Sequence, residues 1–438
     1  MEKTKFDYFF SAFFLIIAAK TTFLTYYDIF WFIFSISCLS YGLYKRRIYV
    51  SDLYVFVGFT IIYIVYIIFR NVFFNKLDIN YLLSDIFFLL KYILLAFIFC
   101  IVFKRNATIL ISEVIIKFAK ISLILYIFQL LGGGEVLFRI GIIFHNIFPY
   151  PGNSETYSNF LIFTYDKLHS IRNSGFVWEP GAFGCFLTIG LLFHFMKNNF
   201  KFDRNSKILA VSILTTISTT AYLAFGVLMF LYYRVNGGII SIKMILGFAV
   251  GIVLFFSLPF LGDKIIQTYQ DDVKALDDYE MIINGLDYFT ENEGEVKLNR
   301  FASGVFLYRN FGHQLIFGVS NAYINVKSSV YGVEISKFNI SNGIIDFIAK
   351  FGMIGLIFLF YRIGNFIYIH YQKLEFSLYI IFIILVMNFG EPLLILPITL
   401  IFLFLPRFSE IEEEDEEEDE NEEEETKLRN AINFYSKK

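Results

Sequence analysis

Apolar residues along the chain are gathered into long runs, and each run is closed by a short polar or charged segment. Most runs hold roughly 17 to 25 residues, the length that an α-helix needs to cross a hydrocarbon core about 30 Å thick. Open strands would leave backbone groups unpaired in lipid, so the pattern predicts an all-α, polytopic membrane protein with about 12 transmembrane helices. The predicted spans are 6–26, 28–44, 52–69, 81–103, 110–131, 176–196, 207–219, 220–233, 242–261, 342–363, 376–390 and 392–406, of which 207–219 and 220–233 also fit one broken pair.

Basic residues fall in alternate connections between these spans. They occur in the N-terminal MEKTK, at 45–47, at 104–105, from 197 to 207, at Arg234 with Lys243, and from Arg362 to Lys373. The positive-inside rule places that side in the cytoplasm, together with both termini of a multi-pass chain. A signal peptide is the rival interpretation of residues 1–19, but they lack a convincing small-x-small cleavage site, and their removal leaves the remaining topology unchanged.

The opposite side receives two long external loops, at about 132–175 and 262–341. Connections of that length are uncommon unless they take part in binding or catalysis. The three cysteines, Cys38, Cys100 and Cys185, all fall inside predicted spans. Neither long loop can therefore form a disulfide.

Composition supports a membrane protein and reveals a division of charge. Of the residues, 57% are hydrophobic and 18% are charged, and the mean hydropathy of +0.60 lies outside the usual soluble range. Residues 410–425 contain 14 acidic groups, whereas residues 1–408 carry 33 basic and 26 acidic groups. Because the acidic tract repels itself, we expect a polytopic membrane domain at 1–408 and a disordered cytoplasmic tail at 409–438, with partner or cation binding as the alternative for the tail.

The stretch RNSGFVWEPGAFG, from Arg172 to Gly184, carries charged groups to the edge of a predicted span. Pro180 suits the first turn of a helix, so we expect the helix to begin there with Glu179 in the capping position at the outer membrane boundary. A purely structural interpretation also exists. The helix dipole stabilises a carboxylate at this end, and Gly175 permits a bend that brings Arg172 to Glu179 as an ion pair.

The pattern R-x-x-G-x-x-x-E-P ahead of a membrane helix resembles the signature of bacterial O-antigen and capsule repeat-unit polymerases, the Wzy-type branch of the O-antigen polymerase and ligase superfamily. Two further segments resemble that family: NRFASGVFLYRNFGHQLIFGVSN, which contains an arginine and ends in a Gly-rich turn, and the following helix SNGIIDFIAKFGMIGLIFLF. The ligase branch often has a histidine where this chain has Asn339 and Asn342, which favours a polymerase.

The resemblance implies a fold similar to that of C-type glycosyltransferases. It also implies an enzyme that polymerises undecaprenyl-diphosphate-linked oligosaccharide repeat units into the O-antigen of lipopolysaccharide or into capsular polysaccharide. The reaction would occur at the outer face of the bacterial cytoplasmic (inner) membrane, with no metal and no cofactor. The expected partners are the lipid-linked glycans, with a chain-length regulator and a flippase of the same pathway, and no nucleic acid.

Such a reaction expels a lipid diphosphate, whose charge calls for guanidinium groups that bind phosphate oxygens bidentately. A nearby carboxylate takes the proton from the attacking hydroxyl. The resemblance assigns these catalytic roles to Arg172, Arg300 and Glu179, and both arginines also bind the substrate.

Three further residues are candidates for substrate binding. On a straight helix Arg309 lies on the face opposite Arg300, so both meet one diphosphate only if the segment bends, and Arg300 fits the family pattern better. His313 is of a residue type that often acts as a base near neutral pH, although surface contacts or structural pairing also account for His313 and Arg309.

Lys91 lies in mid-span with Asp85 as its only local partner, on the opposite half of the helix. We expect Lys91 to face the bundle or a wet cavity, such as one for the substrate.

No metal site is expected, because the acidic residues between 271 and 278 fit no calcium loop and no cluster suits zinc. Two other functions stay open. One is an O-antigen ligase of the same superfamily, which moves a finished glycan to another acceptor. The other is a polytopic transporter or lipid-glycan flippase, which needs no catalytic groups in external loops.

Overall fold

The computed structural model of the chain describes residues 3–74, 78–149, 156–237, 276, 296–298 and 300–408. The described part is mainly helical. Its α-helices are α1 (Lys5–Ala18), α2 (Phe23–Tyr26), α3 (Asp28–Tyr44), α4 (Val50–Phe74), α5 (Ile79–Phe88), α6 (Leu94–Phe103), α7 (Asn106–Phe128), α8 (Gly134–Ile147), α9 (Pro180–Lys197), α10 (Arg204–Thr215), α11 (Thr219–Val235), α15 (Arg300–Phe311), α16 (Gly343–Tyr371), α17 (Leu374–Gly390) and α18 (Pro397–Leu400).

Short elements join and flank these helices. Single π-helical turns at Leu89–Ile93 and Gln129–Gly133 connect α5 to α6 and α7 to α8. Two pairs of three-residue strands are β1 (Tyr157–Asn159) antiparallel to β2 (Thr164–Asp166), and β3 (Val296–Leu298) parallel to β4 (Phe338–Ile340).

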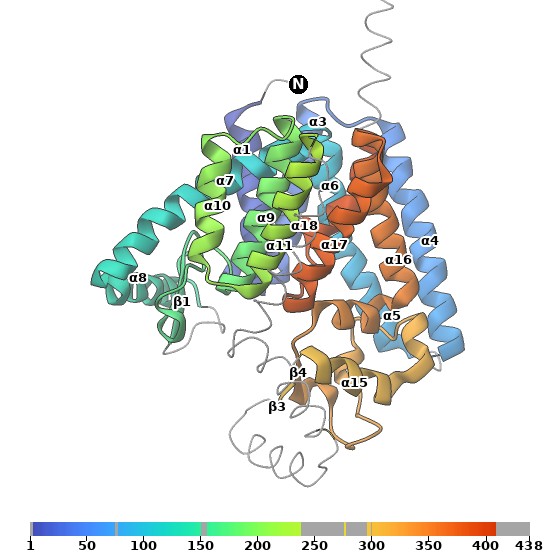
Figure 1. Cartoon of the computed structure of the whole chain (residues 1–438). Coiled ribbons are helices and arrows are strands. Elements are labelled where there is room, and N and C mark those ends of the chain that lie inside the picture. The colour runs from blue at the N-terminus through green and yellow to red at the C-terminus, as the bar shows by residue number, and fades with distance from the viewer. Residues whose placement is uncertain are drawn as a thin grey trace, which may run out of the picture.

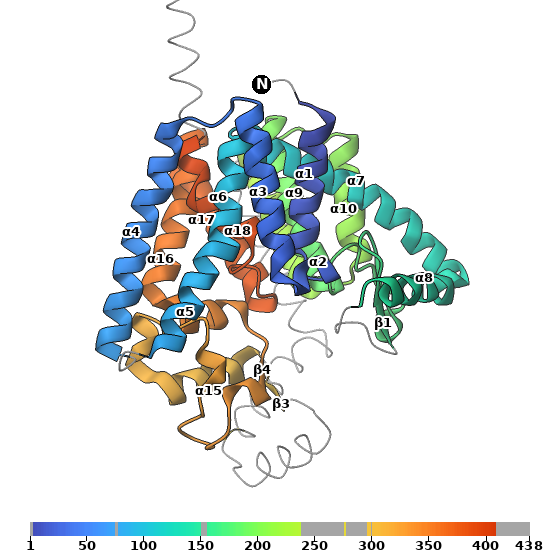
Figure 2. The same ribbon diagram turned by 180° about the vertical axis from the view of Figure 1, so that it is seen from behind.

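Most of the helices stand side by side as a bundle (Figure 1). Within it α9 packs against α7, α10 and α11, and α16 packs against α17. The helix α4 stands along one edge, and α8 projects sideways at the other. The view from behind shows α15 and the β3–β4 pair gathered at the end of the bundle where α16 begins (Figure 2).

Five helical stretches in the described part are long and apolar enough to cross a membrane. They are Val50–Phe74, Ile79–Phe103, Asn106–Ile147, Pro180–Lys197 and Gly343–Tyr371. The helices α3, α11 and α17 are apolar but shorter. The chain is thus an all-α protein with helices suited to a membrane, as the sequence predicts, while the twelve-span count stays a prediction.

Burial separates the outer helices from the central one. On α4 the side chains of Ile62 and Val65 are 72% and 61% exposed, which suits a helix that faces lipid. In α9 every residue from Pro180 to Phe195 is buried. A Cβ atom on Gly184 would lie 2.3 Å from the Ala221 Cβ of α11, so this glycine allows α9 and α11 to pack closely. The segment RNSGFVWEPGAFG therefore leads into the most enclosed of the five long apolar stretches.

Two predicted spans are interrupted. The span 6–26 breaks after Ala18, because Lys20 adopts a left-handed backbone with φ of 53°. The span 392–406 is not one helix: Pro392 and Pro397 flank a non-helical stretch, and α18 gives way to a 3-10 turn at once. Proline lacks the backbone N–H that continues a helix, which accounts for the second break.

The segment predicted as the first long external loop contains more regular structure than a loop would. The π-helical turn leads directly from α7 into α8, and β1 and β2 follow within the predicted loop at 132–175. The predicted loop begins at 132, where the backbone of Gly132 is left-handed with φ of 94° and kinks the chain between α7 and α8. The predicted span 242–261, the acidic tail and much of the loop at 262–341 lie outside the described residues.

Candidate active site

Hydrogen bonds fix the segment that precedes α9 against the end of α10. Arg172 Nε donates to Thr216 O at 3.0 Å, and the Gly175 N–H donates to Asn173 Oδ1 at 3.0 Å. The backbone of Gly175 is left-handed, with φ of 51°, and a Cβ atom on it would lie 2.4 Å from the Phe183 ring. Only glycine fits this bend, which directs the chain from Arg172 into the start of α9.

Glu179 takes the N-cap position of α9 and Pro180 is the first helical residue, as the sequence predicts. The side chain of Glu179 nevertheless makes no hydrogen bond to the N–H groups of that helix. The ion pair expected between Arg172 and Glu179 is not formed within the described residues, where the Arg172 Nε donates to a backbone carbonyl instead. The half-buried carboxylate of Glu179 thus lies at the N-terminus of α9 without a capping bond to that helix.

A second carboxyl group, that of Glu391, meets Glu179. Glu391 follows the last residue of α17 and is 3% exposed. A Cβ atom on Gly181 would lie 2.2 Å from Glu391 Oε1, and one on Gly343 would lie 2.4 Å from Glu391 O. Glu391 Oε2 has no hydrogen-bond partner among the described residues. The start of α9, the end of α17 and the start of α16 thus converge on one acidic side chain.

The electrostatics of Glu391 define the site. Burial raises the pKa of this carboxyl well above its usual range, and its hydrogen bonding with Glu179 and the charge of Glu179 raise it further. The positive charges of Arg300 and Arg172 lower the pKa in part. The protonated form of Glu391 is therefore favoured, since two adjacent carboxylates in a buried place repel each other.

Arg300 is brought to this place by the start of α15. Asn342 Nδ2 donates to Arg300 O at 3.1 Å, while Asn342 Oδ1 accepts from the N–H groups of Ile344 and Ile345 at 3.0 and 3.2 Å. Asn342 therefore caps α16 and fastens the first residue of α15 to it. Asn342 thus has a structural role at this place.

The structure thus gathers three of the predicted site residues around Glu391 and places the other three elsewhere. Arg172, Glu179 and Arg300 all act electrostatically on Glu391, and we call these four residues the junction. Arg309 and His313 are exposed and lie at the other end of α15 or just beyond it.

Lys91 occupies the π-helical turn after α5. Its ammonium pairs with Asp28 at the start of α3 and lies 4.8 Å from the centre of the Trp31 ring. The expectation that Lys91 faces the bundle agrees with this place, and its role in substrate binding stays a prediction.

The sequence prediction missed Glu391, although a signal was present. Glu391 is followed by Pro392, and Glu179 by Pro180, so both carboxylates stand immediately before a proline between apolar runs. A charged residue at such a boundary is usually solvated, so the position of Glu391 in the sequence does not by itself indicate a buried site.

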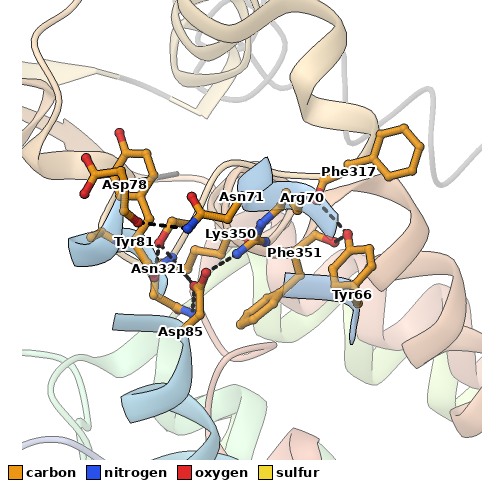
Figure 3. Close-up of polar contacts among 12 residues, drawn as sticks. Tyr66, Arg70, Asn71, Asp78, Tyr81, Asp85, Phe317, Asn321, Lys350 and Phe351 are labelled. Carbon is orange, nitrogen blue, oxygen red and sulfur yellow. Dashed lines mark hydrogen bonds and ion pairs between the residues drawn. The ribbon is translucent and has the colours of Figure 1, made fainter. Parts of the chain in front are cut away.

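A buried ion pair anchors the segment that follows α15. Arg70 of α4 and Asp85 of α5 pair side chain to side chain, with exposures of 0% and 2% (Figure 3). Asp85 Oδ1 also accepts from Asn321 N at 2.9 Å, Asn321 Nδ2 at 3.0 Å and Ser320 Oγ at 3.2 Å. Burying a carboxylate without such partners costs free energy. Arg70, Ser320 and Asn321 therefore all stabilise the buried Asp85, and Asp85 in turn holds the loop in place.

The turn at Gly318 packs against α16 close to the Arg70–Asp85 pair. Gly318 and Gly352 have φ of 73° and 72°, and a Cβ atom on Gly318 would lie 2.4 Å from Gly352 N. Tyr66 OH links the two segments, because its hydrogen lies between Phe317 O at 2.6 Å, in the turn, and Phe351 O at 2.9 Å, in α16 (Figure 3). The turn is fixed to α16 at Gly352, while Asn342 fixes the start of α15 to the beginning of that helix.

The junction combines two guanidinium groups with two carboxyl groups at one end of the bundle, and glycines at its contacts let the backbones approach closely. The guanidinium groups of the junction can bind an anion, and its carboxyl groups can accept or donate a proton beside that anion.

Comparisons of the chain with protein-family models, with curated protein sequences and with solved structures found no match.

Proposed function

We propose that the chain is a glycosyltransferase that polymerises undecaprenyl-diphosphate-linked oligosaccharide repeat units into O-antigen or capsular polysaccharide. The observation that carries the proposal is the junction of Arg172, Arg300, Glu179 and Glu391 where α9 begins. The resemblance of R-x-x-G-x-x-x-E-P to the Wzy-type polymerases supports the same reaction. In the proposed topology twelve spans leave both termini in the cytoplasm and the junction at the outer face of the bacterial cytoplasmic membrane.

Arg172 and Arg300 bind the diphosphate of the lipid carrier. Within the described residues neither guanidinium forms a direct ion pair with a carboxylate, so their charges are available to an anion. The bond from Arg172 Nε to Thr216 O leaves the two terminal nitrogens to bind phosphate oxygens. As the leaving group gains charge in the transition state, these fixed guanidinium groups stabilise it.

Glu179 serves as the base. It takes the proton of the acceptor hydroxyl while the oxygen forms its bond to the anomeric carbon of the growing glycan. The bond from that carbon to the diphosphate oxygen breaks, and the lipid diphosphate leaves with the bonding electrons. Glu391 keeps its own proton, which removes repulsion between the two carboxyl groups and orients Glu179 by a hydrogen bond.

The test is a reaction with purified protein and one defined undecaprenyl-diphosphate repeat unit, without added metal or energy source. We expect a ladder of products that differ by one repeat unit. Arg172→Ala and Arg300→Ala should abolish the ladder, and Lys207→Ala, an exposed change on α10, should keep it. A full ladder from both arginine variants would refute the site. A ligase would form product only when a separate acceptor is supplied, and a transporter would form none.

A further inference from the structure

A second cavity lies at the other end of α9. It has a volume of about 340 Å³. Its described lining residues are Lys104, Arg105, Thr108, Ile109, Met196, Lys197, Asn199, Phe366, His370 and Leu405. The junction stands before the first residue of α9 and this cavity holds its last, so the whole length of the helix separates the two. We call this cavity the basic pocket.

The basic pocket carries an excess of positive charge. Lys104, Arg105 and Lys197 line it, and no acidic residue does so among the described lining residues. The Lys104 ammonium lies 3.6 Å from Asp52 Oδ2 and that of Lys197 lies 2.6 Å from Glu113 Oε1, so each already has a counter-ion behind it. The exposed Arg105 pairs with no carboxylate in the described part of the chain.

A helix start adds to this charge. The helix α7 begins at Asn106, and Arg105 in its cap position makes no side-chain hydrogen bond to the helix. Thr108 and Ile109 of the first turn line the pocket. The positive end of the dipole of α7 therefore favours an anion at the same wall as Arg105.

The chain supplies a polyanion at this place. Leu405 lines the pocket, and the described residues end three positions later at the fully buried Phe408. Residues 410–425, with 14 acidic groups, follow directly. Twelve residues in random-coil conformation would span about 20 Å, so a segment tethered at Phe408 would meet the pocket at high effective concentration.

We propose that the basic pocket is the docking site of the acidic segment 410–425 of the same chain. Tethering favours this occupant over a free anion, because the segment loses little translational freedom on binding. Different carboxylates of the segment can pair in turn with the few cations of the pocket. Because the contact is electrostatic, salt should weaken it strongly. The proposal is independent of the reaction at the junction.

The test is zero-length carbodiimide crosslinking of the full-length protein in nanodiscs of neutral lipid that hold one copy each, followed by mass spectrometry of linked peptides. This reagent joins a lysine amine to a carboxylate in contact with it. We expect a link between Lys197 and the segment 410–425. The link between Lys197 and Glu113 reports in the same sample that the bundle is intact, since that ion pair belongs to the fold.

Arg105→Glu should abolish the link to the acidic segment, as should about 1 M salt, where charges are screened beyond about 3 Å. Lys207→Glu, an exposed reversal outside the pocket, should leave the link unchanged. A link that survives Arg105→Glu, or one equally strong to Lys207 in the unsubstituted protein, overturns the proposal. So does its loss when anionic lipid is added to the nanodisc, because a lipid headgroup would then be the preferred occupant.

Discussion

Glu179 and Glu391 meet carboxyl to carboxyl, although the helices from α9 to α17 lie between them in the sequence. One stands before the first residue of α9 and the other after the last residue of α17. Burial and the charge of Glu179 raise the pKa of Glu391, which favours a single negative charge on the pair. Glu179, the proposed base, therefore has Glu391 as a fixed partner beside Arg172 and Arg300.

Replacing Glu391 by glutamine should remove a pH dependence of stability. Burial raises the pKa of Glu391 well above that of the unfolded chain, so the folded protein binds this proton more tightly. The resulting stabilisation is complete below the unfolded pKa and is lost as the pH rises through the folded pKa. The thermal unfolding midpoint of the unsubstituted protein should therefore fall with rising pH over that window, relative to Glu391→Gln. Identical profiles for the two proteins would mean that the pKa is not raised.

Gly181→Ala should damage the reaction more than the fold. The added Cβ would lie 2.2 Å from Glu391 Oε1, which is the end of a flexible side chain, so the carboxyl moves and the backbone does not. Gly226→Ala on α11 is the matched control, since nothing lies within 4 Å of its Cβ. Alanine favours a helix over glycine by about 1 kcal/mol, so the control should unfold no earlier than the parent. Chain growth measured with the defined repeat unit should fall only in Gly181→Ala, and equal activity of the two variants would argue against Glu391 at the site.

The two arginines of α15 should differ in effect. Arg300→Ala should lower the rate of polymerisation by about 10²- to 10³-fold, the loss expected when a donor to a developing negative charge is removed. Arg300→Lys should recover only part of the rate, since an ammonium cannot bind two phosphate oxygens in a fixed plane. Arg309→Ala should stay near the parent rate, because Arg309 is exposed at the far end of the helix. A larger loss from Arg309→Ala than from Arg300→Ala would reverse the assignment.

Asp85→Asn should destabilise the fold and reduce activity without touching the junction. The change leaves the fully buried Arg70 guanidinium without its counter-ion, and removing one partner of such a pair costs about 3–5 kcal/mol. It also weakens the bonds that hold Asn321 and Ser320, and so the segment that continues from α15. Replacing both partners together, as Arg70→Met with Asp85→Leu, should recover much of the stability but not the anchoring of the segment. Unfolding midpoints and polymerisation rates measured on both variants separate the two effects.

The sequence predicts the helices well where apolar runs are long and closed by charges. The spans at 28–44 and 81–103 agree with the structure within a few residues, and Pro180 marks the start of α9 as expected. Prediction fails where a local break competes with an apolar run. The last predicted span is non-helical from Pro392 to Leu396 and becomes helical only at Pro397, while Gly132 kinks the path from α7 into α8.

The candidate site was only partly accessible to sequence reasoning. Arg172, Glu179 and Arg300 follow from a pattern, and the structure places them together around Glu391. Glu391 itself carries no local motif beyond its proline, because its environment is made by helix ends that are distant in the sequence. The pairing of Lys91 with Asp28 is likewise a tertiary contact that no spacing within one helix could show.

The left-handed backbone at Gly352 makes α16 two rods rather than one. The first rod, Gly343–Phe351, is fastened to the Gly-rich turn and, through Asn342, to Arg300. The second rod continues beside α17 toward the other end of the bundle. When a bilayer thickens or thins, long helices adjust by tilting. We therefore expect a change in bilayer thickness to tilt the second rod and to leave the spacing of the charged groups, which are fastened to the first rod, unchanged.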